Sequence, residues 1–534
     1  MSANPRLPVV LAAIAVAATA TMGSPIAGFA GALATTTALT SSLNPSTFGQ
    51  SVTFTATVTS NTPQAAGTTA TQVWGQSGSF STGGAGTSAT TLGGPQNTIE
   101  DSAGNLYVAD ANNSRILFFP AGSTTATRVY GQGGSFTGGT CNNGGETAST
   151  LCSPHGLALD AAGNLYVADT ANDRVLRFLS GTTTADEVWG QSGSFTTMGS
   201  GTTASTLFAP RGVALDANGD LYVDDTNNNR VLYFPAGSGC TAPNIPSGCG
   251  VATAVYGQAA SFTTNNINTP SETAGTLSHP EALCVDGNGI LYIPDTGNNR
   301  VLYFTPGDTT ATRVYGQSGS FTTGGAGTSA TTLSHPNGCA TDARGDLYVS
   351  DGINNRILFF ASGSTTATQV YGQGGSFTSS TPNNGGESAS SLAYPHGLSV
   401  DRNGNLYTAD HNNNRVLEYP GVVPTGTITF SIDGTTVATR TVGTGGSVAY
   451  STSTLAVGAH QVTATYSGDS NFAGSTTTPA LVQTVESPTP SVPNTGAPAL
   501  TSALWILAGT MLAGGGLASA LAGRRRRAGA RLRR

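Results

Sequence analysis

The sequence predicts an all-β protein that combines a six-bladed β-propeller with a β-sandwich built from two separated segments, followed by a C-terminal transmembrane helix. Three observations lead to this prediction. One phrase recurs six times between residues 69 and 420, strand-like runs lie on both sides of that array, and an apolar stretch near the C-terminus ends in a cluster of arginines. The repeat is taken first, because a fixed period indicates the architecture before any single residue does.

The repeat is clearest at residues 154 to 178, PHGLALDAAGNLYVADTANDRVLRF. GLALD and LYVAD alternate apolar with small or polar residues, and polar turns separate them from each other and from RVLRF. Each copy therefore predicts three short antiparallel strands. The second Asp of the copies lies at Asp110, Asp169, Asp225, Asp295, Asp351 and Asp410, with spacings of 59, 56, 70, 56 and 59 residues, the size of a propeller blade.

A second motif, Val-[Trp/Tyr]-Gly-Gln, supplies a fourth strand to each blade. It begins at Val73, Val129, Val188, Val255, Val314 and Val370, so one copy precedes the array and none follows the sixth repeat. We therefore expect residues 70–76 to pair beside residues 415–419 as the outer strand of the last blade, because this closure removes the free sheet edges. It also brings the two ends of the array together.

The repeated phrase resembles the NHL repeat family, whose members are six-bladed propellers. The residues that carry the resemblance are Pro154, Gly156, Asp160, Gly163, Leu165, Tyr166, Asp169, Asn172 and Arg174, and residues 69–420 contain six such units in phase. The departures are small, since Asn97 and Ala282 stand where the first Gly is expected.

Residues 35–62 and 425–486 hold the remaining strand-like runs. The first segment has two, which are too few to bury a core alone, and the second has five. Together they give seven strands, the number in an immunoglobulin-like sandwich. The runs NPSTFGQSVTFTATVT and LAVGAHQVTATYSGDSNFAGS resemble bacterial Ig-like repeat domains, in which His460 would replace a corner tyrosine and brace a turn.

The propeller would then be a guest between the second and third strands of the sandwich. A host loop tolerates such a guest when the ends of the guest lie close together, as the closure predicts. The alternative is an unstructured stalk before the propeller and a separate partial sandwich after it.

Both ends of the chain carry targeting signals. Residues 1–34 are typical of a secretory signal peptide, with a membrane helix as the weaker alternative. Residues 487–496 form a linker that ends in Val492, Pro493, Asn494, Thr495 and Gly496. Residues 497–523 are long and apolar enough to cross a bilayer, and residues 524–534 form a basic cytoplasmic tail.

The five-residue motif resembles the sortase sorting signal of Gram-positive surface proteins. The resemblance implies cleavage between Thr495 and Gly496 and linkage to peptidoglycan, and a simple single-pass membrane anchor is the alternative. In both cases the domains face outside, so we expect an extracellular protein at the cell surface.

Charge and cysteine content agree with export. The chain has no lysine, and eight of its 21 basic residues lie in the terminal segments, which leaves 13 arginines against 28 acidic residues, a charge of about −15. Such a chain lacks the basic footprint that nucleic acids require. Cys141 and Cys152 are both absent from the sister segment of the sixth repeat, TPNNGGESASSLAYPHG, which predicts a disulfide between them.

The other four cysteines give two further expectations. Cys240 and Cys249 lie in one short insert, GCTAPNIPSGCG, and are predicted to form a second disulfide, which an oxidising compartment permits. Cys284 and Cys339 lie one position out of phase on the inner strands of neighbouring blades. We expect them to face opposite sides and to remain free, buried thiols. The absence of a Cys-x-x-Cys pair argues against zinc.

Two polar patterns occur in every blade and are therefore interpreted as scaffold. The Asp of each Asp-x-x-Gly unit could suggest calcium, but Asx side chains bond their own turn backbone, and calcium loops concentrate several ligands in one segment. In Asp-x-x-Asn-x-Arg, the acid ends a strand, Asn suits a left-handed turn residue, and Arg can pair with the acid.

One position differs from blade to blade and is the candidate ligand site. It follows the first Pro of each repeat and reads Gln96, His155, Arg211, Glu281, Asn337 and His396. The first strand of a propeller blade lines the channel, so these side chains should form a mixed polar ring at one mouth. His279 and His335 lie one residue before this position.

The preferred prediction is a non-enzymatic display protein whose propeller binds a protein or glycan at the cell surface. No catalytic residue, metal ligand or cofactor is assigned. The alternative is a metal-dependent lyase or hydrolase that uses the channel histidines, since NHL propellers include a peptide-amidating lyase that holds zinc with histidines from several blades. Polar channel residues also commonly hold water.

Overall fold

The computed structural model describes residues 34–60, 67–82, 84–197, 199–241, 248–268, 271–443, 446–469 and 472–488. The predicted signal peptide lies outside these residues except for its last position. The predicted sorting motif, the predicted transmembrane segment at 497–523 and the predicted basic tail also lie outside them. Within the ranges just given, no helix combines the length and the hydrophobicity that a membrane span requires.

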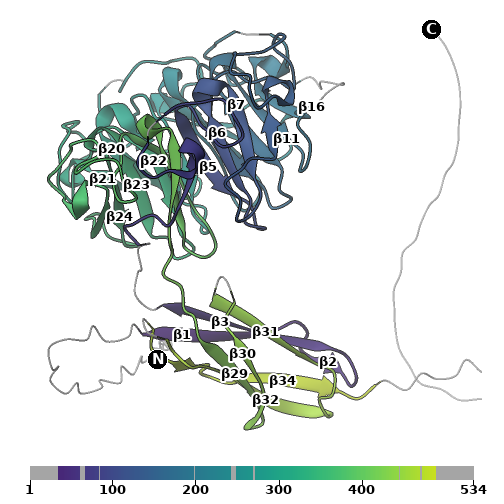
Figure 1. The fold of residues 1–534 in the computed structure, drawn as a ribbon. Helices are drawn as coiled ribbons and strands as arrows, with labels where there is room; N and C mark the ends of the chain where they lie inside the picture. The colour runs from purple at the N-terminus through teal and green to yellow at the C-terminus, as the bar shows by residue number, and fades with distance from the viewer. Residues whose placement is uncertain are drawn as a thin grey trace, which may run out of the picture. The chain divides into compact units, whose positions relative to one another are not determined.

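The described residues form six sheets around a channel and a separate two-layered sandwich, with no α-helix among them (Figure 1). The predicted all-β fold class is confirmed. In five blades all strands run antiparallel in sequence order from the channel outward, and the sixth does so for its three inner strands.

Each blade has four strands. The innermost are β5 (Pro95–Glu100), β9 (Pro154–Leu159), β13 (Val213–Leu215), β18 (Cys284–Val285), β22 (Pro336–Thr341) and β26 (Pro395–Val400). The second are β6 (Leu106–Asp110), β10 (Leu165–Asp169), β14 (Leu221–Asp225), β19 (Leu291–Asp295), β23 (Leu347–Asp351) and β27 (Leu406–Asp410). The third are β7 (Arg115–Phe119), β11 (Arg174–Phe178), β15 (Arg230–Phe234), β20 (Arg300–Phe304), β24 (Arg356–Phe360) and β28 (Arg415–Tyr419). The outer are β8 (Arg128–Tyr130), β12 (Glu187–Gly190), β17 (Ala254–Tyr256), β21 (Arg313–Gly316), β25 (Gln369–Tyr371) and β4 (Gln72–Gly75).

Short 3₁₀ helices connect these strands. Between the second and third strands lie η2 (Ala111–Asn113), η4 (Thr170–Asn172), η6 (Thr226–Asn228), η8 (Thr296–Asn298), η10 (Gly352–Asn354) and η12 (His411–Asn413). After the outer strands lie η1 (Gln76–Gly78), η3 (Gln132–Gly134), η5 (Gln191–Gly193), η7 (Gln258–Ala260), η9 (Gln317–Gly319) and η11 (Gln373–Gly375). The short strand β16 (Cys240–Thr241) adds a fifth strand to the second blade.

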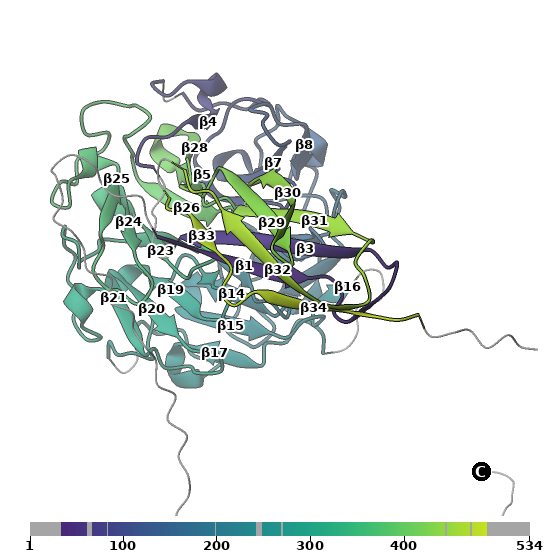
Figure 2. The ribbon, with the colours of Figure 1, turned by 90° about the horizontal axis from the view of Figure 1, so that it is seen from below.

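The first outer strand closes the ring as predicted. β4 pairs antiparallel with β28, with Trp74 opposite Val416 and Val73 opposite Leu417 (Figure 2). The sixth blade is therefore completed by residues that precede the first. Outside the strands, the Gly67 amide also donates to the Pro420 carbonyl at 2.8 Å, so the entry and exit of the array lie side by side.

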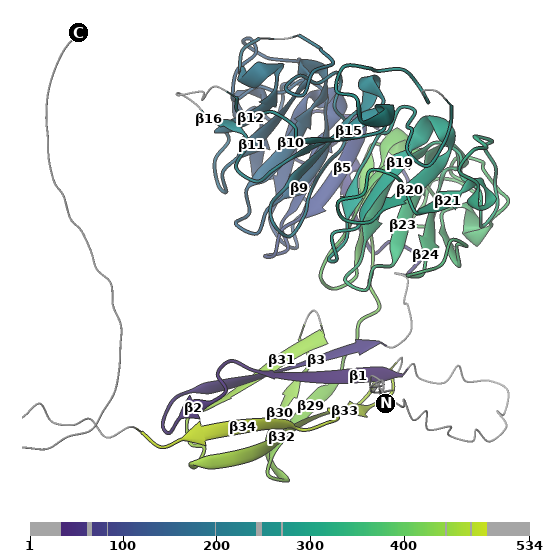
Figure 3. The same cartoon turned by 180° about the vertical axis from the view of Figure 1, so that it is seen from behind.

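The sandwich draws its strands from both sides of the propeller, and Figure 3 shows its two layers. One sheet contains β1 (Thr35–Ser41), β3 (Val52–Ser60) and β31 (Ser447–Thr452). The other contains β2 (Ser46–Thr47), β29 (Thr427–Ile432), β30 (Thr435–Thr441), β32 (Gly458–Tyr466), β33 (Ser475–Thr476) and β34 (Leu481–Glu486). Because β3 pairs with β31 along its length, the early segment is a strand partner of the late one and not a free stalk.

Seven hydrophobic clusters stabilise the two bodies. One fills the sandwich around Phe54 and Phe430, and each of the other six lies between two neighbouring blades. Trp74, for example, leaves the sixth blade and packs with Val108 and Leu117 of the first. Burial of apolar side chains between neighbouring blades therefore stabilises the closed ring.

The prediction for Cys284 and Cys339 is wrong, because the two form a disulfide with their Cα atoms 5.8 Å apart. They are out of phase as expected, since Cys284 is opposite Tyr292 and Cys339 is opposite Val349. However, neighbouring blades face each other with opposite sides of their sheets. A one-residue offset therefore turns the two thiols toward each other across the interface between blades.

The two predicted disulfides, Cys141–Cys152 and Cys240–Cys249, are present as well. No free cysteine occurs in the described part of the chain.

Candidate functional site: the channel mouth

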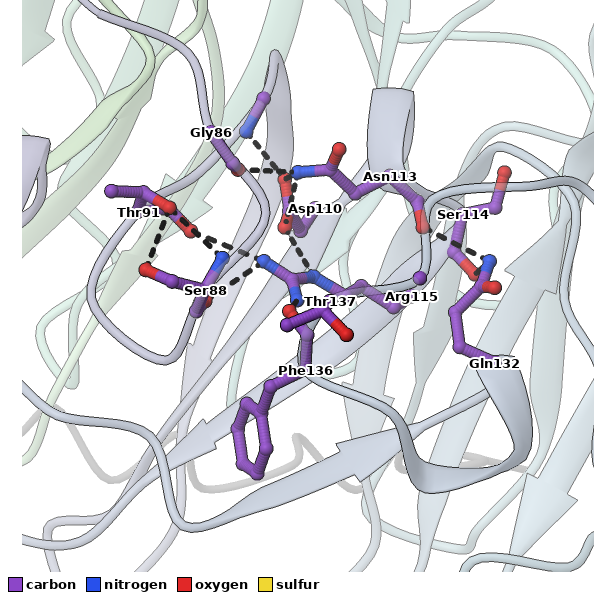
Figure 4. Close-up of polar contacts among 12 residues, drawn as sticks. Gly86, Ser88, Thr91, Asp110, Asn113, Ser114, Arg115, Gln132, Phe136 and Thr137 are labelled. Carbon is purple, nitrogen blue, oxygen red and sulfur yellow. Dashed lines mark hydrogen bonds and ion pairs between the residues drawn. The ribbon is translucent and has the colours of Figure 1, made fainter.

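A buried network joins the Asp, Asn and Arg of each repeat. In the first blade, Arg115 Nε donates to Asp110 Oδ2 at 2.6 Å, and the Asn113 amide donates to the same carboxylate at 2.9 Å (Figure 4). The remaining guanidinium nitrogens donate to the carbonyls of Phe136, Ser88 and Thr91. One side chain thus fastens two loops and a strand end together.

The same network occurs in all six blades. The arginines are 0 % exposed and pair with the preceding acid in each case: Arg115, Arg174, Arg230, Arg300, Arg356 and Arg415. Burial raises the pKa of these carboxyls, to about 6 for Asp225 and Asp351, while the arginine opposes that shift. A buried ion pair is stable only when its hydrogen bonds are satisfied, as they are here, so the scaffold interpretation holds.

One detail of that interpretation needs correction. The left-handed residue is the one after the Asn of the motif, as at Ser114 with φ 52° and Asp173 with φ 55°. The Asn itself ends the 3₁₀ helix and uses its side chain to bond the acid. The Asp of each Asp-x-x-Gly unit behaves as predicted, since Asp160 Oδ1 accepts the amides of Ala162 and Asn164 at 2.9 Å.

The six predicted slot residues come together at one mouth of the channel. Gln96, His155, Arg211, Glu281, Asn337 and His396 all line one cavity of about 10 Å³. That volume is about what one water molecule needs. The innermost strands bring these side chains together, because each slot residue lies at or just before the start of its strand. This placement is as expected, whereas the binding of a ligand there stays a prediction.

Polar atoms in the ring are left over after internal pairing. Arg211 and Glu281 form an ion pair across the third and fourth blades. Within the described residues, Arg211 Nε, both amide atoms of Asn337 and His396 Nε2 are buried without a partner in hydrogen-bonding geometry, although the Tyr394 hydroxyl approaches Asn337. Buried polar groups are normally paired, so such atoms indicate bound water or a ligand.

Three imidazoles gather on one side of the mouth. The rings of His396 and His411 have centroids 4.8 Å apart, and Tyr394 lies against His396 at 4.9 Å. Burial lowers the pKa of His155 to about 3, with smaller contributions from Arg211 and His411. Burial likewise lowers the pKa of His396 well below its usual range, so these imidazoles are neutral at pH 7.

The sequence analysis did not identify two residues of this region. His411 replaces the small residue that follows the second Asp in the other blades, and its Nδ1 lies 3.2 Å from the Gln96 amide nitrogen. Asp224 is 0 % exposed, and only the Thr226 hydroxyl approaches its carboxylate among the described residues, outside ideal hydrogen-bonding geometry; burial beside Glu281 raises its pKa well above its usual range. Each differs in residue type from the equivalent positions of the other five blades. That difference is the sequence signal that could have identified them.

His279 and His335 do not line the cavity. Both have a positive φ, 45° and 52°, and each donates its backbone amide to an Asn side chain of the preceding blade. The described residues contain no group of three or more His, Cys, Asp or Glu arranged to hold a metal ion. His460, in the sandwich, braces a turn as expected, with Nδ1 2.7 Å from Asp433 and Nε2 2.9 Å from the Ala456 carbonyl.

Comparisons with family models identify both domain types. The NHL repeat model matches residues 151–178 and 209–234, and the model of the bacterial Ig-like domain (group 3) matches residues 388–486. The Ig-like match starts inside the sixth blade. It omits residues 35–60, which are distant in sequence but pair with β31 in the folded sandwich. No curated protein matches the chain.

Solved structures give propeller likenesses of low score. A streptogramin B lyase is 13% identical with a TM-score of 0.34, covering 65% of this chain and 97% of its own. A protein of unknown function from Bacteroides thetaiotaomicron is 15% identical with a TM-score of 0.43, covering 70% and 83%. The Cps50 (Swd1) β-propeller domain of Myceliophteria thermophila is 9% identical with a TM-score of 0.37, covering 62% and 98%. None carries a functional argument at these scores. The chain thus contains NHL repeats, which lie in a six-bladed β-propeller, and a bacterial Ig-like domain whose strands come from both sides of that propeller.

Proposed function

We propose that this protein is an exported, surface-anchored binding protein without enzymatic activity, whose propeller binds a protein or glycan ligand. The observation that carries the proposal is the contrast within each repeat. The buried Asp, Asn and Arg are the same in six blades, whereas the slot that faces the channel holds five residue types in six blades. Asymmetry in a ring of side chains at the channel mouth is what a single binding site requires.

The size of the ring favours binding over catalysis. A space for about one water molecule cannot enclose a substrate, so a ligand would contact the mouth from outside. The three disulfides support an oxidising compartment, and the sorting motif at 492–496 would supply the anchor through sortase and peptidoglycan.

The alternative function is a metal-dependent lyase or hydrolase. It is favoured by one observation, the three neutral imidazoles of His155, His396 and His411, since metal ligands must be deprotonated. These residues would need to move to act together, because in their present arrangement the described residues form no metal-binding group.

Two measurements separate the functions. Metal analysis of the purified full-length protein, with His155→Ala and His396→Ala as controls, should find no stoichiometric metal that either substitution removes. A pull-down of cell-wall and surface material should recover a ligand that a variant with a disrupted slot, Arg211→Ala with Glu281→Ala, does not retain. Stoichiometric metal that both histidine variants lose would instead establish the enzyme alternative.

A further inference from the structure

The channel has a second, wider opening at the end opposite the slot. Each innermost strand starts at or shortly after its slot residue and ends at an Asp-x-x-Gly turn, so these turns surround the other end. A hollow of about 590 Å³ lies there, between the turns of the second, third and fourth blades. It shares Leu159, Leu215 and Val285 with a channel cavity of about 190 Å³, so the two spaces adjoin. A hollow of this size accommodates several side chains of a partner.

The floor of the hollow is aliphatic. Leu159, Leu215 and Val285 occupy equivalent positions at the ends of their strands, and each is only half-buried against a hydrophobic cluster between blades. The same position holds Glu100 in the first blade and Thr341 in the fifth, so three consecutive aliphatic residues occur only on this side of the ring. Apolar surface that stays accessible gains free energy when a partner covers it.

The rim of the hollow is acidic. Asp160 and Asp216 are partly exposed, and among the described residues their carboxylates accept hydrogen bonds only from amide groups of their own turns. The three hairpins around the hollow contain four acidic residues and no basic one, over residues 157–165, 213–221 and 283–291. The hollow therefore carries a negative charge that no cation of these hairpins compensates.

The opposite side of the same propeller face differs in charge. In the fifth blade, Arg344 pairs with both Asp342 and Asp346. In the sixth, Arg402 directly follows the turn residue Asp401. The turn motif is the same on both sides, so the difference comes from the residues inside the turn. The uncompensated negative charge is thus a property of blades two to four.

From this geometry we propose that the hollow at blades two to four docks a basic segment of a partner protein. An aliphatic side chain of that segment packs against Leu159, Leu215 and Val285. An arginine or lysine of the segment lies beside Asp160 and Asp216. Complementary charge selects the partner, and apolar contact at the centre holds it.

A peptide segment suits this hollow because each aliphatic residue of the second and third blades directly precedes its turn Asp. Neighbouring side chains of one segment can therefore make both kinds of contact. The side chains that make the contact are partly exposed, so a partner reaches them without rearrangement. The site is at the other end of the channel from the slot and goes beyond the function proposed there, which stands or fails by its own test.

The first experiment measures binding of three capped synthetic peptides to the purified full-length protein. One alternates leucine and arginine, one has glutamate in place of arginine, and one has serine in place of leucine. We expect only the leucine-arginine peptide to bind strongly. Its affinity should fall between about 0.15 M and about 1 M salt, because the Debye length falls from about 8 Å to about 3 Å. Failure of that peptide to bind, or equal binding of the serine peptide, would overturn the proposal.

Two variants locate the site. Asp216→Asn keeps an oxygen that can accept the turn amides and removes the charge, so it should weaken binding about two- to fivefold. Leu215→Thr introduces the residue type of the fifth blade and should weaken binding at least about fivefold, because apolar contact is lost. The matched control is Asp342→Asn, which has the same turn but whose carboxylate pairs with Arg344, and it should bind nearly as the unmodified protein does.

The pattern of losses decides the outcome. Equal effects of Asp216→Asn and Asp342→Asn would show that general surface charge attracts the peptide, and unchanged binding by Leu215→Thr would show that the aliphatic floor makes no contact. Either result overturns the proposal. Melting temperatures of the three variants are compared, so that a folding defect is not mistaken for a lost contact.

Discussion

The channel slot and the Asp-Asn-Arg network lie at the same end of the propeller and differ in almost every physical respect. The network is identical in six blades, fully buried and internally hydrogen-bonded. The slot varies between blades, is partly exposed at Arg211, and leaves polar atoms unpaired. The difference teaches that the repeat keeps its buried network constant in every blade while the side chains at the channel mouth vary from blade to blade.

Replacing one arginine of the Asp-Asn-Arg network should lower stability more than any other substitution considered. Arg174→Leu leaves Asp169 buried without its cation and frees two loops, which should lower the free energy of unfolding by about 3 to 5 kcal/mol. The exposed Arg440→Leu is the control and should change it by less than about 0.5 kcal/mol. Urea denaturation measures both. Equal effects would show that the network does not stabilise the propeller.

The disulfide between blades should be worth more than the local one. Cys284–Cys339 closes a separation of 55 residues and Cys141–Cys152 one of 11. The chain-entropy model gives about 4 and about 3 kcal/mol for such loops, because a longer loop loses more freedom in the unfolded state. Double Ser variants of each pair, compared by thermal unfolding, should rank in that order. The reverse order would show that native-state packing outweighs loop entropy.

Substitution of the first glycine of the repeat tests how closely the backbones of neighbouring blades approach each other. A Cβ at Gly156 would lie 2.5 Å from the Arg211 carbonyl oxygen and 2.9 Å from the Val213 nitrogen, both backbone atoms of the next blade. Gly156→Ala should therefore cost about 1 to 3 kcal/mol by overpacking and widen the slot. Gly84→Ala, where no atom lies within 4 Å, is the control. A Gly156→Ala variant as stable as the unmodified protein would show that the two blades can move apart without cost.

The blades could be predicted from the sequence because each one repeats the same local chemistry six times. The closure by Val73 and the split sandwich followed from counting strands, which is a topological argument that needs no coordinates. Cys284 and Cys339 could not be placed, because their contact depends on which sheet faces meet between blades. His411 and Asp224 were missed for a related reason: each is a single departure, and its meaning comes from the side chains of the neighbouring blade.

Lowering the pH should change stability in opposite directions through the slot histidines and through His460 of the sandwich. We expect these to be the smallest of the effects considered. Burial holds the pKa of His155 at about 3 and that of His396 well below its usual range, so the unfolded chain binds protons more readily. Their contribution to stability is therefore complete above about pH 6.5 and is lost as the pH falls toward 3. Replacing His396 by Phe removes its share of that loss. On acidification, the melting temperature of the unmodified protein should therefore fall more than that of the His396→Phe variant.

His460 has the opposite sign, because the Ala456 carbonyl and Asp433 raise its pKa. Its contribution is complete below about pH 6.5 and is lost as the pH rises through the raised pKa. The melting temperature of a His460→Gln variant should therefore approach that of the unmodified protein at alkaline pH and fall below it at acidic pH. Calorimetry of both variants over one pH series tests the contrast directly. Shifts of the same sign would mean that the channel histidines are open to protonation, which removes the basis for a neutral ring.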